Sequence, residues 1–252
     1  MRSLPRLMVA PSGARLTKQD HPKLPVTLPE IVSTARACHA AGADGLHLHL
    51  RDAEGGHILD AGLYREALAE LSRAVPSLAI QITTEAVGRY GVARQIDVAL
   101  HSGAGLVSVA LREILAKITP ARAAAFYHQC HDQGIAVQHI VFGRADLENL
   151  QQVIALLPKA ITPQILLVLG RYSDGAPSDP SALDTLLQAE IFKATDPDWA
   201  ACAFGQPETA CLRRARALGG KCRVGFENNR LNADGTVARD NAERVAEIAG
   251  FV

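Results

Sequence analysis

Two histidines, His47 and His49, lie two residues apart within the apolar run Gly45–Leu50. Side chains two apart on a β-strand point to the same face, so both imidazoles would project together while Leu48 points into a packed layer. Paired imidazoles at the end of a buried strand form half of a metal site and need a third ligand from elsewhere in the chain. The alternative is that both are structural histidines, each hydrogen-bonded to the backbone.

The rest of the chain alternates strand-like and helix-like segments, which predicts eight βα units. Apolar runs typical of strands buried on both faces lie at 6–10, 45–50, 78–83, 106–111, 135–142, 164–169, 199–204 and 221–226. Segments with helical spacing follow them at 27–42, 63–75, 93–100, 120–133, 146–157, 181–193, 207–218 and 242–248. Thr27 and Glu30 form a capping-box pattern, and Asp146 is the expected cap of its helix.

Eight such units in 252 residues predict one (β/α)8 barrel domain, residues 1–252. A doubly wound open sheet is the alternative, but no G-x-G-x-x-G fingerprint follows any strand. The formal net charge of +0 argues against a nucleic-acid or membrane-surface role. No apolar run approaches a membrane span, and the N-terminal apolar segment is too short for a signal peptide. The five cysteines form no C-x-x-C pair, which indicates reduced thiols in a cytoplasmic protein.

In a (β/α)8 barrel the active site lies where the strands end, so polar residues at those positions are the candidates. They are Arg15 after the first strand, Thr83, Thr84 and Glu85 after the third, Ser108 and Arg112 at the fourth, His139 on the fifth, and Arg223, Glu227 and Asn228 on and after the eighth. His57, His101, His128 and His131 are expected away from the barrel mouth and are given no role.

Glu227 is the favoured third ligand. In a closed barrel the eighth strand packs beside the first, and the second strand, which carries His47 and His49, is the next one along, so Glu227 can reach the mouth near the two histidines. Glu85 and His139 remain alternatives. Two histidines and a carboxylate with one open position suit Zn²⁺ best, with Fe²⁺ or Mn²⁺ possible. Arg112 and Arg223 could be ordinary ion-pair arginines, and serine or threonine hydroxyls often close strand ends by local hydrogen bonds.

Several ordered segments resemble the β-keto acid cleavage enzyme family. The segment GADGLHLHLRD matches the family hallmark G-A-x-x-x-H-x-H-x-R-D. The N-terminal Gly13-Ala14, the stretch 81–84 (QITT) and the closing block 223–229 (RVGFENN) agree as well. The resemblance runs from about Val9 to the C-terminus.

The resemblance implies a zinc-dependent (β/α)8 barrel that exchanges a β-keto acid with acetyl-CoA, giving acetoacetate and a new acyl-CoA. It implies that His47, His49 and Glu227 bind zinc and that Arg223 works with the catalytic base. Thr83 and Ser108 match hydroxyl positions that contact the substrate. A homodimer or homotetramer is also implied.

The chain departs from the family pattern at three positions. The aspartate that serves as general base is replaced by Asn228, and an amide is no useful base near neutral pH. The glutamate that recognises a substrate amino group is replaced by Arg15, and an acidic residue on the fifth strand by Ile140. We therefore expect Glu85 to act as the base and the substrate to be carboxylate-rich, with Arg112 and Arg223 holding carboxylates.

Two other functions stay open. The first is a barrel that binds metal and ligand without cleavage, because Asn228 replaces the expected base. The second is an amidohydrolase-type metal hydrolase, although that type places its H-x-H on the first strand. Arg171 and the polar loop 170–180 are candidates for contacts with the phosphates of CoA.

Overall fold

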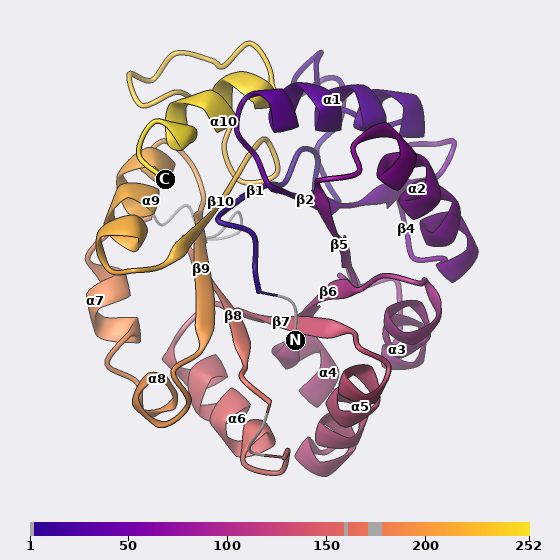
Figure 1. Ribbon diagram of the computed structural model, residues 1–252, viewed down its shortest axis with the longest axis vertical. Helices are drawn as coiled ribbons and strands as arrows, with labels where there is room; N and C mark the ends of the chain where they lie inside the picture. The colour runs from indigo at the N-terminus through magenta and orange to yellow at the C-terminus, as the bar shows by residue number, and fades with distance from the viewer. Residues whose placement is uncertain (1–2, 159–160, 171–177) are drawn as a thin grey trace.

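The computed structural model describes residues 3–158, 161–170 and 178–252, and its centre is a closed barrel of parallel strands (Figure 1). The strand order around the barrel is β1-β10-β9-β8-β7-β6-β5-β2. The barrel strands are β1 (Leu7–Val9), β2 (Gly45–Leu48), β5 (Ala79–Thr83), β6 (Leu106–Ala110), β7 (Ala136–Val141), β8 (Gln164–Leu169), β9 (Asp198–Ala203) and β10 (Lys221–Val224). The predicted (β/α)8 barrel is confirmed.

Helices form a ring outside the strands (Figure 1). They are α1 (Leu28–Ala40), α2 (Ala61–Ala74), α3 (Val92–His101), α4 (Leu111–Leu115), α5 (Pro120–Asp132), α6 (Arg144–Ile154), α7 (Ala182–Leu186), α8 (Glu190–Thr195), α9 (Glu208–Ala217) and α10 (Asn241–Ala249). The predicted helix 181–193 is two short helices, α7 and α8, and the short helix α4 was not predicted. A small antiparallel hairpin, β3 (Leu50–Arg51) and β4 (His57–Ile58), was also not predicted. None of the helices in the described residues is long and apolar enough to cross a membrane.

Two predicted helix caps have different outcomes. The Glu30 carboxylate accepts the backbone N–H of Thr27 at 3.0 Å, as the capping box requires. The prediction for Asp146 is wrong, because α6 begins at Arg144 and places Asp146 inside its first turn. From there the carboxylate reaches back to the N–H of Phe142 at 2.8 Å, so it satisfies a free backbone donor without being the cap residue.

The interior of the barrel is apolar at the end where the strands begin. Leu4, Met8, Leu106 and Leu166 pack together there. The N-terminal segment that carries Leu4 crosses the middle of the ring (Figure 1). This packing closes one end of the barrel and leaves the opposite end, where the strands finish, for polar side chains.

Candidate active site

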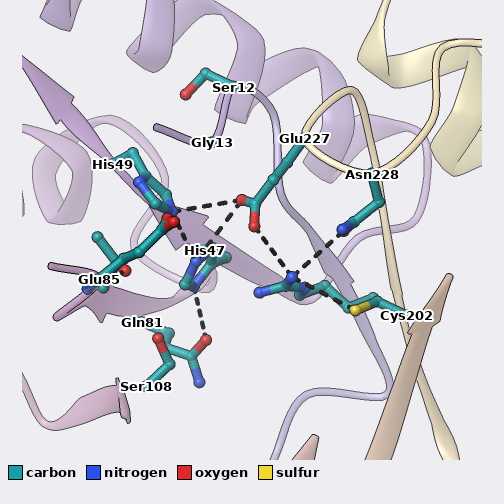
Figure 2. Close-up of polar contacts among 12 residues, drawn as sticks. Ser12, Gly13, His47, His49, Gln81, Glu85, Ser108, Cys202, Glu227 and Asn228 are labelled. Carbon is teal, nitrogen blue, oxygen red and sulfur yellow. Dashed lines mark hydrogen bonds and ion pairs between the residues drawn. The ribbon is translucent and has the colours of Figure 1, made fainter. Parts of the chain in front are cut away.

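A cavity of about 520 Å³ lies over the carboxyl ends of the barrel strands, and His47, His49 and Glu227 line it together. His47 is on β2 and His49 follows its last residue; the side chain of each is 1% exposed. Their Nε2 atoms are 3.1 Å apart. Glu227 Oε2 is 3.7 Å from Nε2 of His47 and 3.5 Å from Nε2 of His49 (Figure 2). The structure therefore brings the two histidines and the favoured third ligand together.

His139, an alternative third ligand, is not available to this cluster. It pairs in register with Ile165 of β8 and packs its ring edge-on against Tyr127 of α5, with ring centroids 4.6 Å apart. Its neighbour Gln138 bonds to Gln81 instead, on the opposite face of the strand. The His139 side chain therefore points toward the helices. Burial there lowers its pKa to about 3, which keeps the ring neutral.

The cluster His47, His49 and Glu227 fits a tetrahedral divalent metal. One atom from each of the three residues lies within 4.8 Å of the other two. Ligands about 2.0–2.1 Å from a tetrahedral zinc are about 3.3 Å apart, close to the spacing of the three atoms here. Burial lowers the pKa of His47 to about 4 and that of His49 well below its usual value, so both rings are in the neutral form that binds metals.

Gln81 fixes the orientation of His47. Its Oε1 accepts from Nδ1–H of His47 at 2.8 Å, while its Nε2 donates to Oε1 of Gln138 at 2.9 Å. A ring that donates through Nδ1 carries its lone pair on Nε2, the atom that faces His49 and Glu227. This hydrogen-bond chain inside the barrel therefore leaves Nε2 of His47 in the form that can bind a metal.

We expect Gln81→Leu to weaken metal binding by about 10–100-fold, because His47 loses the partner that sets its tautomer. Gln81→Glu keeps an acceptor for Nδ1–H and should retain most of the affinity. Metal affinity is measured by competition with a chromophoric chelator. Equal losses in the two variants would show that the amide matters through packing and not through its acceptor.

Glu227 lies in a turn after β10, and β10 ends earlier than the predicted strand 221–226. The strand ends at Val224 because Gly225 adopts a φ of +134°, where an added Cβ would lie 2.5 Å from the carbonyl oxygen of Ala10. Asn241 of α10 holds the turn: its Oδ1 accepts the N–H of Phe226 at 2.9 Å, and its Nδ2 donates to the carbonyl of Pro11 at 3.1 Å. The ligand position is thus set by contacts that are distant in sequence.

The loop after β1 packs directly on Glu227. Arg51 of β3 fixes this loop by donating to the carbonyl oxygens of Gly13 and Leu16 at 2.5 and 3.1 Å. Gly13 has a φ of +60°, and a Cβ built there would lie 2.6 Å from Cγ of Glu227. Only glycine leaves room for the ligand side chain at this point (Figure 2).

We expect Gly13→Ala to lower metal affinity by roughly 10–100-fold, because the added methyl group displaces Glu227. Gly235→Ala is the matched control: it has the same sign of φ, +85°, and nothing lies within 4 Å of its added Cβ. In both variants alanine must adopt a positive φ, which destabilises the folded backbone, so a similar drop in thermal stability is expected. If the metal affinities of the two variants were equal, the contact with Glu227 would be irrelevant.

Arg223 is buried beside the cluster. Its Nη2 donates to Oε1 of Glu227 at 3.1 Å, Oδ1 of Asn228 at 3.3 Å and Sγ of Cys202 at 3.5 Å. Its Nε and Nη1 are buried and have no hydrogen-bond partner among the described residues. Because a guanidinium only donates, the amide of Asn228 must turn its oxygen toward it. Arg223 therefore keeps two donors for an anionic ligand, and Asn228 cannot accept a proton.

Glu85 lines the cavity and has the electrostatics of a base. Burial, reinforced by the charge of Glu227, raises its pKa to about 7. Its backbone N–H donates to Oγ1 of Thr83 at 3.0 Å, and its Oε1 lies 3.2 Å from Nη1 of Arg15. Thr83 and Arg15, both predicted substrate contacts, thus hold Glu85 in the structure.

The prediction that His57 lies away from the mouth is wrong. The hairpin β3–β4 folds it back so that its ring centroid is 5.1 Å from that of His49. Its Nε2 donates to the carbonyl oxygen of Glu85 at 2.9 Å. A two-residue strand has no periodicity to detect, so the sequence carries no signal for this contact.

The remaining predicted contacts divide into two groups. Arg112 lines the cavity, but it already forms two hydrogen bonds with Asp146 and lies 4.2 Å above the ring of Phe142. Thr84 and Ser108 are buried and are not among the described residues that line the cavity. The Thr84 hydroxyl donates to the Ser108 carbonyl at 2.9 Å, a local strand-end bond. Arg171 lies outside the described residues.

The chain matches the beta-keto acid cleavage enzyme family over residues 6–252. It is 26% identical over 244 residues to the 3-keto-5-aminohexanoate cleavage enzyme of Fusobacterium nucleatum, with 94% of this chain and 86% of that protein covered. It is 24% identical over 255 residues to the 3-oxoadipate:acetyl-CoA acetyltransferase of Cupriavidus necator, with 97% and 87% covered.

Among solved structures, the ternary complex of ObcA with a C4-CoA adduct and oxalate is similar in fold. The TM-score is 0.63 at 16% sequence identity, over 91% of this chain and 63% of the ObcA chain. This chain thus spans about three-fifths of the length of ObcA. At this level of identity the similarity concerns the barrel alone.

Proposed function

The chain belongs to the beta-keto acid cleavage enzyme family, and from that premise we propose that it is a zinc-dependent enzyme that exchanges a β-keto acid with acetyl-CoA. In this exchange the C2–C3 bond of the keto acid breaks, and C2, with its carboxylate, joins the acetyl carbon to give acetoacetate. The CoA sulfur leaves the acetyl group and bonds to C3, giving a new acyl-CoA. The observation that carries the proposal is the convergence of His47, His49 and Glu227 beside buried Arg223.

His47, His49 and Glu227 would hold the metal. Bound Zn²⁺ supplies Lewis acidity at the carbonyl oxygen of the keto acid. Gln81 keeps the imidazole of His47 in the tautomer that binds it, and Arg223 holds the carboxylate of Glu227 through Oε1.

Arg223 would also hold the substrate. Leaving Nε and Nη1 of a buried guanidinium unpaired is costly, and a carboxylate oxygen or enolate oxygen would satisfy both donors. Because Arg223 lines the cavity next to Glu227, the group that it binds lies beside the reacting carbons.

Glu85 would act as the general base. It takes the proton from C2 of the keto acid and returns a proton to the same carbon after the C2–C3 bond has broken. The Thr83 hydroxyl oxygen accepts the N–H of Glu85, and His57 donates to the Glu85 carbonyl oxygen. These two hydrogen bonds hold the backbone on both sides of Cα and would orient the carboxylate into the cavity. Arg15 neutralises the carboxylate after it loses its proton.

The expected carboxylate-rich substrate stays a prediction. Arg15 lies at the cavity, but it is paired with Glu85, and Arg112 is paired with Asp146. A distal carboxylate on the substrate would therefore meet arginines whose charge already faces a carboxylate of the protein. The homodimer or homotetramer also stays a prediction, and analytical ultracentrifugation tests it.

We expect Asn228→Asp to raise the KM for the keto acid by roughly 10-fold, because a carboxylate at this position takes up part of the charge that Arg223 offers the substrate. The metal content should not change, since Asn228 is not a ligand. Steady-state kinetics and elemental analysis measure the two quantities. A rise in kcat would instead show that residue 228 can serve as the base and that asparagine limits this enzyme.

The proposal is tested by incubating the zinc-loaded protein with acetyl-CoA and a panel of β-keto acids, and by measuring acetoacetate and acyl-CoA. Formation of both products in equal amounts supports the exchange. Bound zinc without acetoacetate from any acid would favour a barrel that binds metal and ligand without cleavage. Hydrolysis of amide substrates would favour the amidohydrolase type.

A further inference from the structure

The cavity has two chemically different halves. Four consecutive strands, β5, β2, β1 and β10, and the loops after them contribute His47, His49, Glu85, Arg223 and Glu227. The other four strands, β6 to β9, and the segments after them contribute the charged Arg112 and Glu113 and five apolar residues, Ala110, Ile140, Phe142, Val168 and Phe204. We refer to these five apolar residues as the apolar wall. The strands close into a ring (Figure 1). Because the two sets of residues come from opposite arcs of this ring and line one cavity, the apolar wall faces the metal cluster.

The apolar wall is built on the packed interior of the barrel. Val168 belongs to the interior cluster, and Ile140, Phe142 and Phe204 pack against that cluster while remaining partly exposed. Side chains of this kind offer a ligand no hydrogen bond. Placing a charged group against them would leave the charge desolvated and unpaired, which costs several kcal/mol.

The polar groups nearest the apolar wall are already engaged. Arg112 lies on the ring of Phe142 and forms two hydrogen bonds with Asp146, whose second role is to accept the N–H of Phe142. Oε2 of Glu113 accepts from the N–H of Ala86 at 3.0 Å and from Nε2 of Gln95 at 2.7 Å. The charge of Arg112 is thus balanced by Asp146, and the carboxylate of Glu113 holds Ala86 and Gln95 in the fold.

We propose that the apolar wall receives an uncharged alkyl or aryl substituent on C3 of the keto acid. The proposal rests on the proposed function, which places the carboxylate and the reacting carbonyl at the metal cluster and Arg223. The substituent on C3 then extends across the cavity to Ile140 and Val168. This assignment is an alternative to the expected distal carboxylate, which depends on Arg15 and Arg112, and the two lead to opposite results in the first test.

The first test compares three β-keto acids of equal chain length that end in a methyl group, a carboxylate or an ammonium, each with acetyl-CoA and the zinc-loaded protein. We expect kcat/KM for the methyl-ended acid to exceed the other two by roughly 100-fold or more. A preference for the carboxylate-ended or ammonium-ended acid would overturn the wall assignment and leave the exchange reaction standing. Turnover of none of the three acids, while other β-keto acids in the panel react, would also overturn it. If no β-keto acid of any kind reacts, the proposed function itself fails.

The second test places an amide on the wall. Ile140→Gln should lower kcat/KM for the methyl-ended acid by about 10-fold or more, whereas Ile140→Leu, which stays apolar at similar volume, should lower it much less. The KM for acetyl-CoA should be unchanged in both, and thermal unfolding checks that both variants fold. If Ile140→Gln instead raised the KM for acetyl-CoA alone, the wall would bind the thioester and the proposal would be wrong.

Discussion

Replacing His47 with alanine is expected to remove stoichiometric metal and to lower kcat/KM for the exchange by at least about 10³-fold. Loss of a residue that merely orients a ligand typically costs 10–100-fold in metal affinity or activity, and loss of the ligand itself removes one of three protein donors. The His47 side chain is 1% exposed, and its Nε2 lies 3.1 Å from Nε2 of His49, so its loss opens the cluster itself. Elemental analysis and steady-state kinetics measure the two effects.

His139→Gln is the control for this experiment. His139 is also a buried, neutral histidine on a barrel strand, but its ring packs against Tyr127 on the helix side. We expect this variant to lose some thermal stability and to keep its metal. A His47→Ala protein that binds metal as tightly as the wild type would contradict the assigned cluster, and Glu85 would then have to be considered as a ligand.

The barrel was predictable from the sequence because its strands are buried on both faces. Continuous apolar runs such as Gln164–Leu169, each followed by a segment of helical spacing, leave few alternatives to a closed parallel sheet. The predictions that were wrong concern residues whose local sequence pattern indicates one role and whose tertiary contacts give them another. Asp146 looks like a helix cap in sequence, but in the structure it bonds Arg112 and reaches back to Phe142.

The grouping of His47, His49 and Glu227 was predictable because strand geometry fixes it. His47 and His49 share a face of the run that begins at Gly45, and the order of strands in a closed barrel brings the end of β10 near β2. The surroundings of the cluster were not predictable. His57 and Arg51 reach the site through the hairpin β3–β4, and Asn241 holds the turn of Glu227 from the last helix. Such contacts depend on tertiary packing and leave no periodic signal in the sequence.

Predicted substrate contacts were the least certain part, because a residue at a strand end can serve either the ligand or the fold. Thr84 and Ser108 stand at the expected positions, but the Thr84 hydroxyl donates to the backbone of Ser108. Arg112 reaches the cavity with its charge already balanced by Asp146. Sequence position identifies the mouth of the barrel, and only the hydrogen-bond partners distinguish these two uses.

Replacing Glu85 with glutamine is expected to lower kcat by about 10²–10⁴-fold, the usual contribution of a general base. Metal content should be retained, because Glu85 is not part of the cluster with the two histidines. Glu113→Gln is the matched control: Glu113 also lines the cavity and has a pKa raised by burial, but its carboxylate holds Ala86 and Gln95. A glutamine there keeps an acceptor oxygen for both, so its effect on kcat should be much smaller.

The pH profile separates a base from a group that only binds. A base works in its deprotonated form, so kcat/KM of the wild type should rise with pH up to the pKa of Glu85 and then level off. That inflection should lie above the ordinary glutamate value of about 4.3 and no higher than about 7, because a bound dication lowers the pKa of a neighbouring carboxyl. In Glu85→Gln the inflection should disappear. If Glu85→Gln kept the inflection, another group would carry the proton transfer. That group would not be Asn228, because its amide oxygen accepts a hydrogen bond from Arg223.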